Sequence, residues 1–317
     1  MGAIVLRGLQ LVVALFAVSA ACFLLLSLLP GNPVAVLLGP YATPGAVSHL
    51  TNQLGLGRPL LERYLIWLVH ALHGDLGSSY VTGQPVTSAL AERLPVTLEL
   101  MALSQLIALA LAVPLGAWGG LHPGRALDRL TSGVSLGLLS IPGFVVGVGL
   151  VFVFSVHSHL LPATGFVPFE VSPMGNLGSL ILPSATLALG SAPLYARVLR
   201  AELITTLDQD FVTAARARGL SSSAVVMRHA LRPSTLTLVT VGGIHIGHLI
   251  GGAFVVEYLF GLPGVGLLTV DAIYARDYLV VIGATLVVSG GFVIVTALTD
   301  AAALLIEPRL RDARLAA

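Results

Sequence analysis

Residues 281–306 read VIGATLVVSGGFVIVTALTDAAALLI, and this stretch decides the class of fold. Its one charged residue is Asp300, near the end of the run. An apolar run of about 20 residues, coiled as a helix, crosses the roughly 30 Å hydrocarbon core of a bilayer. The run lacks the alternation of a strand, and backbone groups in lipid must be satisfied internally, so a membrane-spanning helix is expected.

The composition of the whole chain points the same way. Of its 317 residues, 56% are hydrophobic and only 10% are charged, whereas a soluble domain carries about 25% charged residues. We therefore expect lipid to solvate most of the surface, and the net charge of +1 gives no sign of a nucleic-acid partner. The single cysteine, Cys22, excludes a disulfide or a cysteine-rich metal site within the chain.

Five further segments are apolar and long enough to span a bilayer, so the sequence predicts an all-α membrane protein with six transmembrane helices. Besides 281–306, the expected spans are 8–29, 96–119, 132–156, 178–199 and 235–256. Pro114, Pro142 and Pro193 lie within or near these spans. A helix bundle tolerates such prolines because neighbouring groups satisfy the freed carbonyls.

The N-terminal run has an alternative interpretation. Arg7 followed by apolar residues 9–29 is also a pattern of secretory signals. The run continues well past Cys22, however, and about twenty apolar residues suit a bilayer crossing better than the shorter core of a signal. A retained first helix is therefore favoured.

Arginines are distributed unequally between the connections that join the spans. All sixteen basic residues are arginine, with twelve in one alternate set of connections and four in the other. The richer set comprises Arg7, Arg125, Arg129, Arg197, Arg200, Arg216, Arg218, Arg228, Arg232, Arg309, Arg311 and Arg314, and the poorer set Arg58, Arg63, Arg93 and Arg276. Because cytoplasmic loops carry the excess of positive residues, both termini are expected in the cytoplasm.

The expected organisation is a single membrane domain with unequal connections. Its parts are a first transmembrane helix at 1–30, an external segment at 31–94, a transmembrane core at 95–306 that includes a cytoplasmic loop at 200–234, and a cytoplasmic tail at 307–317. The external segment contains a short interfacial helix at 60–72, whose Tyr64 and Trp67 suit the membrane–water boundary. A second external loop, rich in turns, is expected at 257–279.

The cytoplasmic loop reads DFVTAARARGL over residues 210–220 and SSS over 221–223. Asp208 or Asp210 can cap a helix at its start, accepting hydrogen bonds from the free N–H groups. Gly219 is well placed to end that helix in a left-handed conformation. The pattern predicts a short helix that stops at the glycine.

A second short helix is expected directly after the first. Ser221 or Ser222 can cap its start, and Pro233 discourages it from continuing. Together the two helices would project from the membrane and display small alanines and arginines to a partner. An ordinary positive loop is the plainer alternative, but it explains the arginines and not the capped helix–glycine–helix arrangement.

No motif that binds nucleotide phosphates occurs in the chain. The pattern G-x-x-x-x-G-K-[ST] is absent, and there is no lysine to reach a phosphate. The chain is therefore not expected to hydrolyse nucleotide by that route, so an ATP-driven motor would be another polypeptide.

The cytoplasmic loop resembles the coupling loop of permeases from ATP-binding-cassette (ABC) importers. The family pattern is Glu-Ala-Ala, three residues, Gly, nine residues, then a hydrophobic residue, any residue and Leu-Pro. Ala214, Ala215 and Gly219 match at the family spacing, and Thr213 replaces the glutamate. The ending is looser, with Leu231-Arg232-Pro233 in place of Leu-Pro.

Segments typical of the dipeptide, oligopeptide and nickel branch of this family extend the resemblance over nearly the whole chain. They are DFV and ARARG within 210–219, LGLGRP at 54–59, GDLGSS at 74–79, RLPVTLEL at 93–100, SIPGF at 140–144, LPATG at 161–165, FGLPGVG at 260–266 and RDY at 276–278. The short N-terminus and long first external loop resemble the B-type member of the permease pair.

The resemblance implies a type I ABC importer permease fold, with 95–306 as the core domain. It implies a channel-forming subunit that moves dipeptides or oligopeptides inward by alternating access in the cell membrane of a prokaryote. Implied partners are a homologous second permease in a heterodimer, two ABC ATPase subunits or domains, and an extracytoplasmic solute-binding protein. ATP and Mg would be bound by the ATPase partners, so this chain is expected to bind no cofactor and not to be an enzyme itself.

The resemblance also implies which residues couple the chain to the ATPase. They are Asp210, Thr213, Ala214, Ala215, Arg216, Arg218, Gly219, Leu231 and Pro233. The cargo stays open, because dipeptides, oligopeptides, nickel chelates, haem and glutathione all pass through related permeases.

Ionisable residues inside a membrane are candidates for function. We therefore expect His245 and His248 to face the transport pathway. Glu257, Asp271 and Asp277 are expected to line an external gate or to contact the delivery protein. The plainer alternative for these three acids is a solvated loop.

Two pairs of histidines, each three residues apart on one helical face, suggest a site for a metal or a proton. The pairs are His70 with His73 and His245 with His248. Neither pair has a nearby cysteine or a clearly placed carboxylate. Hydrogen-bonded or interface-seeking histidines are therefore favoured, and no metal site is predicted.

Two functions of other classes compete with the permease interpretation. A stand-alone proton-coupled transporter could use Glu99, His245 or Asp300 as a proton relay, and its uptake would follow a pH gradient without nucleotide. A membrane hydrolase would need a nucleophile and a base, and Ser155-Val156-His157 is the nearest approach to one. No recognisable catalytic motif supports it.

Overall fold

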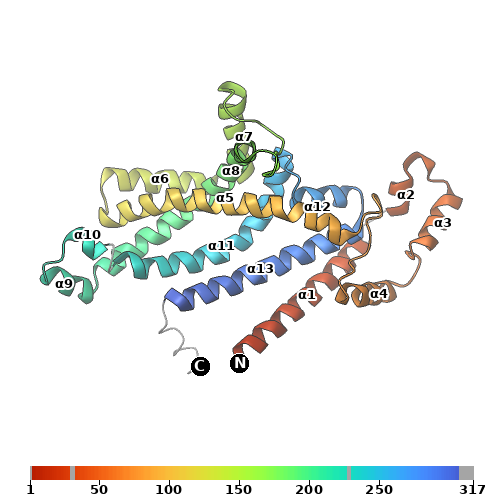
Figure 1. Cartoon of the computed structure of the whole chain (residues 1–317), viewed down its shortest axis with the longest axis horizontal. Helices are drawn as coiled ribbons and strands as arrows, with labels where there is room; N and C mark the ends of the chain where they lie inside the picture. Colours follow the sequence, from red (N-terminus) through yellow and green to blue (C-terminus); the bar gives the residue numbers. More distant parts are fainter. Residues whose placement is uncertain (1, 29–32, 227–229, 307–317) are drawn as a thin grey trace. The chain divides into compact units, whose positions relative to one another are not determined.

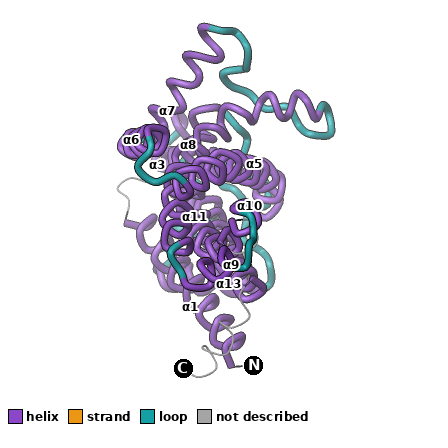
Figure 2. The backbone as a smooth tube through the Cα atoms, turned by 90° about the vertical axis from the view of Figure 1, so that its left-hand side faces the viewer, coloured by secondary structure: helices purple, strands orange, loops and turns teal. Residues whose placement is uncertain are grey.

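The structure is a computed structural model that describes residues 2–28, 33–226 and 230–306. Figure 2 shows this part of the chain as helices joined by loops. Within it, the nearest approach to a strand is an isolated β-bridge between Ser78 and Pro85. The predicted all-α class is confirmed, and the expected tail at 307–317 lies outside the described residues.

The chain divides into two compact units, and Figure 1 labels most of their helices. Unit 1 is Met1–Thr97 with Pro263–Val293, and unit 2 is Leu98–Leu262 with Ile294–Ala317. The helices of unit 1 are α1 (Gly2–Leu28), α2 (Pro33–Leu38), η1 (Gly39–Tyr41), α3 (Pro44–Gln53), α4 (Leu60–Leu72) and α12 (Val265–Tyr274). Those of unit 2 are α6 (Ala126–Ser140), α7 (Gly143–Leu150), η2 (Val151–His157), α8 (Pro173–Leu207), α9 (Asp210–Ala217), α10 (Ser222–Val225) and α11 (Leu231–Phe260). Two helices contribute to both units, α5 (Val86–Leu121) and α13 (Tyr278–Ile306).

Three helices are long and apolar enough to cross a membrane alone, and three bent pairs qualify when each pair is taken as one span. The single spans are Val86–Leu121, Pro173–Leu207 and Tyr278–Thr299. The bent pairs are Val12–Leu28 with Pro33–Tyr41, Ala126–Ser140 with Gly143–His157, and Pro233–Gly247 with Leu249–Phe260. The described residues therefore hold three to six candidate spans, and the count of six stays a prediction.

The span predicted at 132–156 is not one helix. The chain leaves α6 after Ser140, and the axes before and after the break differ by 105°. Ile141 is extended, with φ −95° and ψ 128°, because the ring of Pro142 disfavours a helical residue before it. Proline also lacks the N–H that would continue the ladder of hydrogen bonds, so Pro142 breaks this segment instead of being tolerated within it.

Helix α8 is the element on which unit 2 is built, since α6, α7 and α11 all pack against it. Buried residues of α8 form two clusters with neighbouring helices. One contains Tyr195, Ala188 and Leu238. The other contains Leu199 and Leu203 with Ala230, the residue that precedes α11. The predicted position of Pro193 inside a helix is confirmed.

Glycines on α5 allow that helix to approach α8 closely. A Cβ at Gly116 would lie 2.6 Å from the carbonyl oxygen of Ala196, and one at Gly120 would lie 2.7 Å from the Cβ of Leu203. Neither distance leaves room for a methyl group. Small residues at such crossings let two backbones come together where lipid supplies no hydrophobic drive.

The core of unit 1 gathers aromatic side chains from α1 and α4. The ring centroids of Phe23 and Tyr64 lie 5.4 Å apart, and those of Tyr64 and Trp67 lie 6.1 Å apart. The hydroxyl groups of Ser19 and Tyr64 are 2.9 Å apart. The helix predicted at 60–72 is confirmed as α4, but Tyr64 and Trp67 are buried in this core.

Replacing Gly116 by alanine is expected to lower the thermal unfolding midpoint of the detergent-solubilised protein. The new Cβ would meet the backbone of α8, and overpacking of this kind costs about 1–3 kcal/mol. Gly133→Ala on α6 is the matched control, because a Cβ there meets open space and alanine favours a helix by about 1 kcal/mol. A midpoint for Gly116→Ala at or above that of Gly133→Ala would contradict the close packing.

Candidate functional site

The loop singled out in the sequence forms a short projection at the ends of α8 and α11 (Figure 1). Helix α8 ends with Asp208 as its C-cap residue, and α9 begins two residues later at Asp210. The carboxylate of Asp210 therefore lies in the first turn of α9, where the helix dipole favours a negative charge. The predicted helix start is confirmed, but the predicted cap is not, because Asp208 is the C-cap of α8 and Asp210 is already the first residue of α9.

Gly219 ends α9 as the sequence predicted. Its φ is +81°, in the left-handed region. The N–H of Leu220 donates to the carbonyl oxygen of Ala215 at 3.4 Å, which is the six-to-one hydrogen bond of a Schellman motif. A side chain at position 219 would be strained whatever the space around it, because only glycine adopts this φ without cost.

The start of the second short helix agrees with the prediction, but its end does not. Ser221 caps α10, accepting the N–H of Ala224 on its side-chain oxygen at 3.4 Å. Pro233 was expected to stop this helix, and that expectation is wrong. Helix α11 starts at Leu231, so Pro233 sits in its first turn, where a missing N–H costs no helical hydrogen bond.

Helix α9 has one buried side and one exposed side. Val212 and Ala215 pack with Val225 of α10 and are 0% and 6% exposed. The exposed residues of α9 and its end are Asp210, Phe211, Thr213, Ala214, Ala217, Arg218 and Gly219. The expectation that the alanines are displayed is therefore correct for Ala214 and wrong for Ala215.

Phe211 is a surface residue that the sequence analysis did not single out. Its ring is 48% exposed on α9, beside Thr213 and Ala214. The signal was present in the sequence as an aromatic residue inside an otherwise polar and small-residue loop. Aromatic residues are enriched in the cores of protein interfaces. The side chain of Arg216 lies outside the described side chains.

Apolar packing and one pair of hydroxyl groups connect the base of the projection to α8 and α11. Leu207, the last residue of α8, contacts the cluster of α9 and α10 and also the cluster at the start of α11. Thr206 and Ser234 are buried with their hydroxyl groups 3.3 Å apart, and Ser234 donates to the carbonyl oxygen of Ala230 at 2.9 Å. The hydroxyl of Thr206 therefore donates to Ser234, which joins α8 to α11. Leu231 packs in the same cluster.

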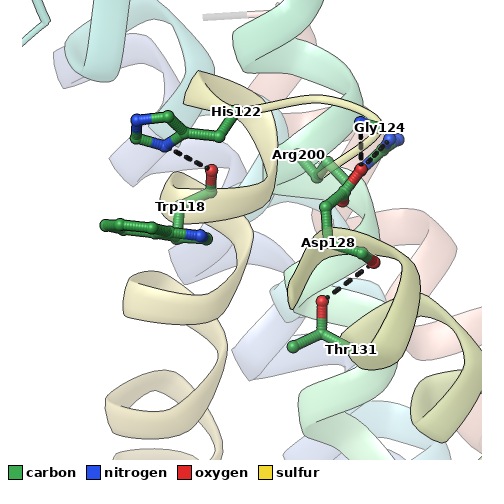
Figure 3. A network of polar contacts seen from close by, with 6 residues as sticks. All are labelled: Trp118, His122, Gly124, Asp128, Thr131 and Arg200. Carbon is green, nitrogen blue, oxygen red and sulfur yellow. Dashed lines mark hydrogen bonds and ion pairs between the residues drawn. The ribbon is translucent and has the colours of Figure 1, made fainter. Parts of the chain in front are cut away.

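An ion pair between the buried Asp128 and the partly exposed Arg200 joins α6 to α8 in unit 2 (Figure 3). Asp128 in the first turn of α6 is 2% exposed. Its two oxygens accept from Nε and Nη2 of Arg200 at 2.5 and 2.9 Å, and one of them also accepts the N–H of Gly124 at 2.8 Å. Such bidentate, charge-assisted pairs are the stronger class of hydrogen bond. A Cβ at Gly119 would lie 2.8 Å from the Asp128 carboxylate, so the pair also needs that glycine.

Figure 3 also shows Trp118 of α5 and His122, the residue that directly follows α5. Nδ1 of His122 lies 3.3 Å from the carbonyl oxygen of Trp118, and the two ring centroids are 4.4 Å apart. Asp128 was not predicted as a functional residue, because an acid among arginines in a loop is usually solvated. Its burial comes from the fold alone.

His245 lies on a cavity of about 270 Å³ in unit 2, together with Ser191, Thr186 and Phe144. Ser191 donates to the carbonyl oxygen of Leu187 at 3.0 Å, so it accepts from Nε2 of His245 at 3.1 Å. The histidine was expected to face a pathway, and the cavity is consistent with that prediction. The side chain of His248 lies outside the described side chains.

The row of polar contacts continues from His245 towards α5. The ring of Tyr195 meets His245 edge-on, with centroids 5.5 Å apart. The hydroxyl of Tyr195 donates to Oε1 of Gln105 at 3.0 Å. Three helices, α5, α8 and α11, are thus connected by polar groups inside an apolar unit.

The three acidic candidates have different surroundings. Glu257 of unit 2 is 0% exposed and lies inside α11, so the alternative of a solvated loop is wrong for it, and its place at an external gate stays a prediction. In unit 1, Asp271 is exposed on α12. Asp277 is 3% exposed and accepts the hydroxyl of Ser79 at 2.5 Å and the N–H of Tyr80 at 3.2 Å. Asp277 therefore has a structural role in anchoring the segment before α5.

The histidines of the first pair point to separate partners. Nδ1 of His70 lies 3.4 Å from the carboxylate of Asp75, and Nδ1 of His73 lies 2.8 Å from the carbonyl oxygen of Val69. Across the described residues, no group of three or more His, Cys, Asp or Glu side chains is placed to hold a metal ion.

Removing either partner of the Asp128–Arg200 pair is expected to lower the thermal unfolding midpoint. Asp128→Ala and Arg200→Ala each leave a charge without its partner, whereas the double variant leaves neither. The double variant should therefore lose clearly less stability than the sum of the two single changes. Arg197→Ala is the control, because Arg197 is exposed on the same helix and such changes stay within about 0.5 kcal/mol. Strictly additive losses would contradict direct coupling.

Comparison with known families covers nearly the whole chain. Residues 112–312 match the family described as binding-protein-dependent transport system inner membrane component. Residues 1–101 match the family that describes the N-terminal part of the membrane component of such systems.

Curated relatives match from end to end. A putative peptide transport system permease protein of Brucella abortus is 39% identical over 96% of this chain and 97% of its own length. A probable peptide ABC transporter permease protein of Sinorhizobium fredii is 35% identical over 98% and 100%. The glutathione transport system permease protein of Escherichia coli O6:H1 is 34% identical over 97% and 98%. The chain belongs to the binding-protein-dependent transport system inner membrane components, the multi-pass permeases of bacterial ABC importers.

Proposed function

We propose that this permease takes up peptides as one of two membrane subunits of an ABC importer, and that α9 is its contact with an ATPase partner. The proposed contact rests on one observation, that one side of α9 is exposed and the other is packed. Its exposed side presents Phe211, Thr213, Ala214 and Arg218, while its other side is packed on α10 and Leu207. A partner that binds to the exposed side therefore displaces α9 together with the residues packed against its other side.

Peptide cargo is supported by the names of the relatives. Two of the three relatives described above are named as peptide transport permeases and one as a glutathione transport permease. The proposal is therefore a dipeptide or oligopeptide importer, with the delivery protein setting much of the specificity.

The proposed assembly is a heterodimer of this chain with a homologous permease, two ATPase subunits or domains, and an extracytoplasmic solute-binding protein. The twelve-to-four distribution of arginines supports cytoplasmic termini. Six spans follow when each bent pair of helices is one crossing. This orientation places α9 and α10 in the cytoplasm, where ATPase subunits lie.

The proposed mechanism is alternating access. Closure of the two ATPase subunits on ATP displaces α9, and the buried contacts of Leu207 and Thr206 pass the displacement to α8 and α11. The Asp128–Arg200 pair makes α6 move with α8. A central pathway between the two permeases then opens alternately to the two sides. His245 and the exposed Asp271 are candidates for contact with cargo or delivery protein.

The proton-coupled alternative has no observation in its favour. Glu99 accepts a hydrogen bond from Nδ2 of Asn176 at 3.0 Å, and Asn176 also donates to the carbonyl oxygen of Val167 at 3.0 Å. His245 is bonded to Ser191. These are local contacts that hold helices and loops together, and no relay between Glu99 and His245 is evident in the described part of the chain.

Gly219→Val is expected to abolish peptide uptake while leaving membrane insertion intact. Valine at a φ of +81° is strained, so α9 would not end in the geometry that the partner recognises. The measurement is uptake of labelled dipeptide by cells that express the whole importer, with the amount of inserted permease determined in the same cells. Gly219→Asn should retain part of the uptake, because asparagine tolerates the left-handed region.

Gly45→Val serves as the control for that experiment. Gly45 lies in α3 with an ordinary φ and open space around its Cβ position, so uptake should be unchanged. Normal uptake by Gly219→Val would count against α9 as the coupling element.

A further inference from the structure

Helix α4 of unit 1 has an apolar stripe that the rest of the unit leaves uncovered. Leu61, Leu65, Val69 and Leu72 are 68%, 50%, 56% and 79% exposed. Their spacing of four, four and three residues places them on one face of the helix. In a membrane protein, a short helix with such a face lies in the interface with its apolar side in lipid.

A cavity of about 350 Å³ opens beside this stripe, within the size range of about 300–1,000 Å³ that is typical of ligand sites. One part of its wall is apolar and comes from α1, α4 and α13, with Leu26, Ile66 and Ile282. Another part carries Arg58 and Arg63. Such a mixture fits a ligand with one charged end and one hydrocarbon end.

The charged part of the cavity carries positive charge that the protein does not neutralise. The Arg63 guanidinium lies 5.6 Å from the ring centroid of Phe23, and no carboxylate among the described residues forms an ion pair with it. Arg58 pairs with Glu62 at 3.3 Å, but the two side chains are 57% and 50% exposed. An exposed pair of this kind is worth about 0–1 kcal/mol, so a bound anion can compete for Arg58.

The acidic residue of the cavity wall, Asp75, has hydrogen-bond partners other than the two arginines. Its carboxylate accepts the N–H of Gly77 at 2.8 Å and lies 3.4 Å from His70. The Gly77 hydrogen bond, followed by that of His70, holds the pKa of Asp75 below its usual value. Its charge is therefore satisfied locally. Arg63 also contacts the hydroxyl of Tyr80, a neutral group, so its positive charge stays available to an anionic ligand.

We propose that this cavity binds an anionic phospholipid, with the headgroup phosphate at Arg63 and Arg58 and one acyl chain along Leu26 and Ile282. A free phosphate or a peptide carboxylate shares the anionic chemistry but has nothing to fill the apolar part. The adjoining stripe of α4 supplies the path from the bilayer. Trp67, Tyr80 and Tyr278 also line the cavity.

Trp67 allows the site to be tested directly, because it lines the cavity and the chain contains only one other tryptophan. The full chain with Trp118→Phe is reconstituted in phosphatidylcholine vesicles that contain increasing amounts of a lipid with brominated acyl chains. We compare the mole fraction of each brominated lipid at which Trp67 fluorescence is half-maximally quenched. This mole fraction is expected to be about fivefold lower for phosphatidylglycerol than for phosphatidylcholine, because one contact between an arginine and an anionic lipid is worth about 1 kcal/mol.

Arg63→Gln is expected to remove that preference, and Arg63→Lys to retain most of it. Arg93→Gln is the matched control, since Arg93 belongs to unit 1 but does not line the cavity. If Arg63→Gln does not insert, Arg58→Gln replaces it, with a weakened preference expected. Equal quenching by the two lipids, or a preference unchanged in both variants, would overturn the proposal. Relief of the quenching by millimolar inorganic phosphate would overturn the lipid part and assign a phosphate site.

Discussion

Motion of a short surface helix reaches the membrane only if that helix is packed against elements that move with it. In unit 2 this packing centres on Leu207, which contacts the cluster under α9 and the cluster at the start of α11. Protein interiors are close-packed and transmit displacement instead of absorbing it. The glycine at the end of α9 then has a mechanical consequence, because it fixes where α9 stops and which side of it faces outward.

Helix α8 contributes one partner to several polar pairs between the described helices of unit 2. Arg200 pairs with Asp128 on α6, Thr206 with Ser234 on α11, Ser191 with His245 on α11, and Tyr195 with Gln105 on α5. An unpaired polar group costs several kcal/mol in hydrocarbon. The same pairs therefore satisfy buried groups and fix which helices move together. The glycines of α5 complete the arrangement by bringing that helix onto α8.

Local chemistry in the sequence was enough to predict α9, Gly219 and the Ser221 cap, because each depends on residues within one or two turns. The break at Pro142 was mispredicted, since hydropathy measures the apolar length of a segment and not its direction. The burial of Ala215 and Glu257 and the partner of Asp128 depend on which helix packs opposite them. The contact of Asp128 with Arg200 joins residues far apart in sequence, and that of Ala215 with Val225 joins two separate helices, so the pattern within one helix encodes neither.

The most direct measurement is a crosslink from the exposed side of α9. Cys22 is the only cysteine in the chain, so Cys22→Ser with Ala214→Cys creates a single thiol on the side of α9 proposed to meet the ATPase. A thiol-specific photocrosslinker on that residue should join the permease to an ATPase subunit in membranes containing the whole importer. The buried position of Ala215→Cys should give little labelling. Efficient labelling at position 214 without an ATPase adduct would contradict the account.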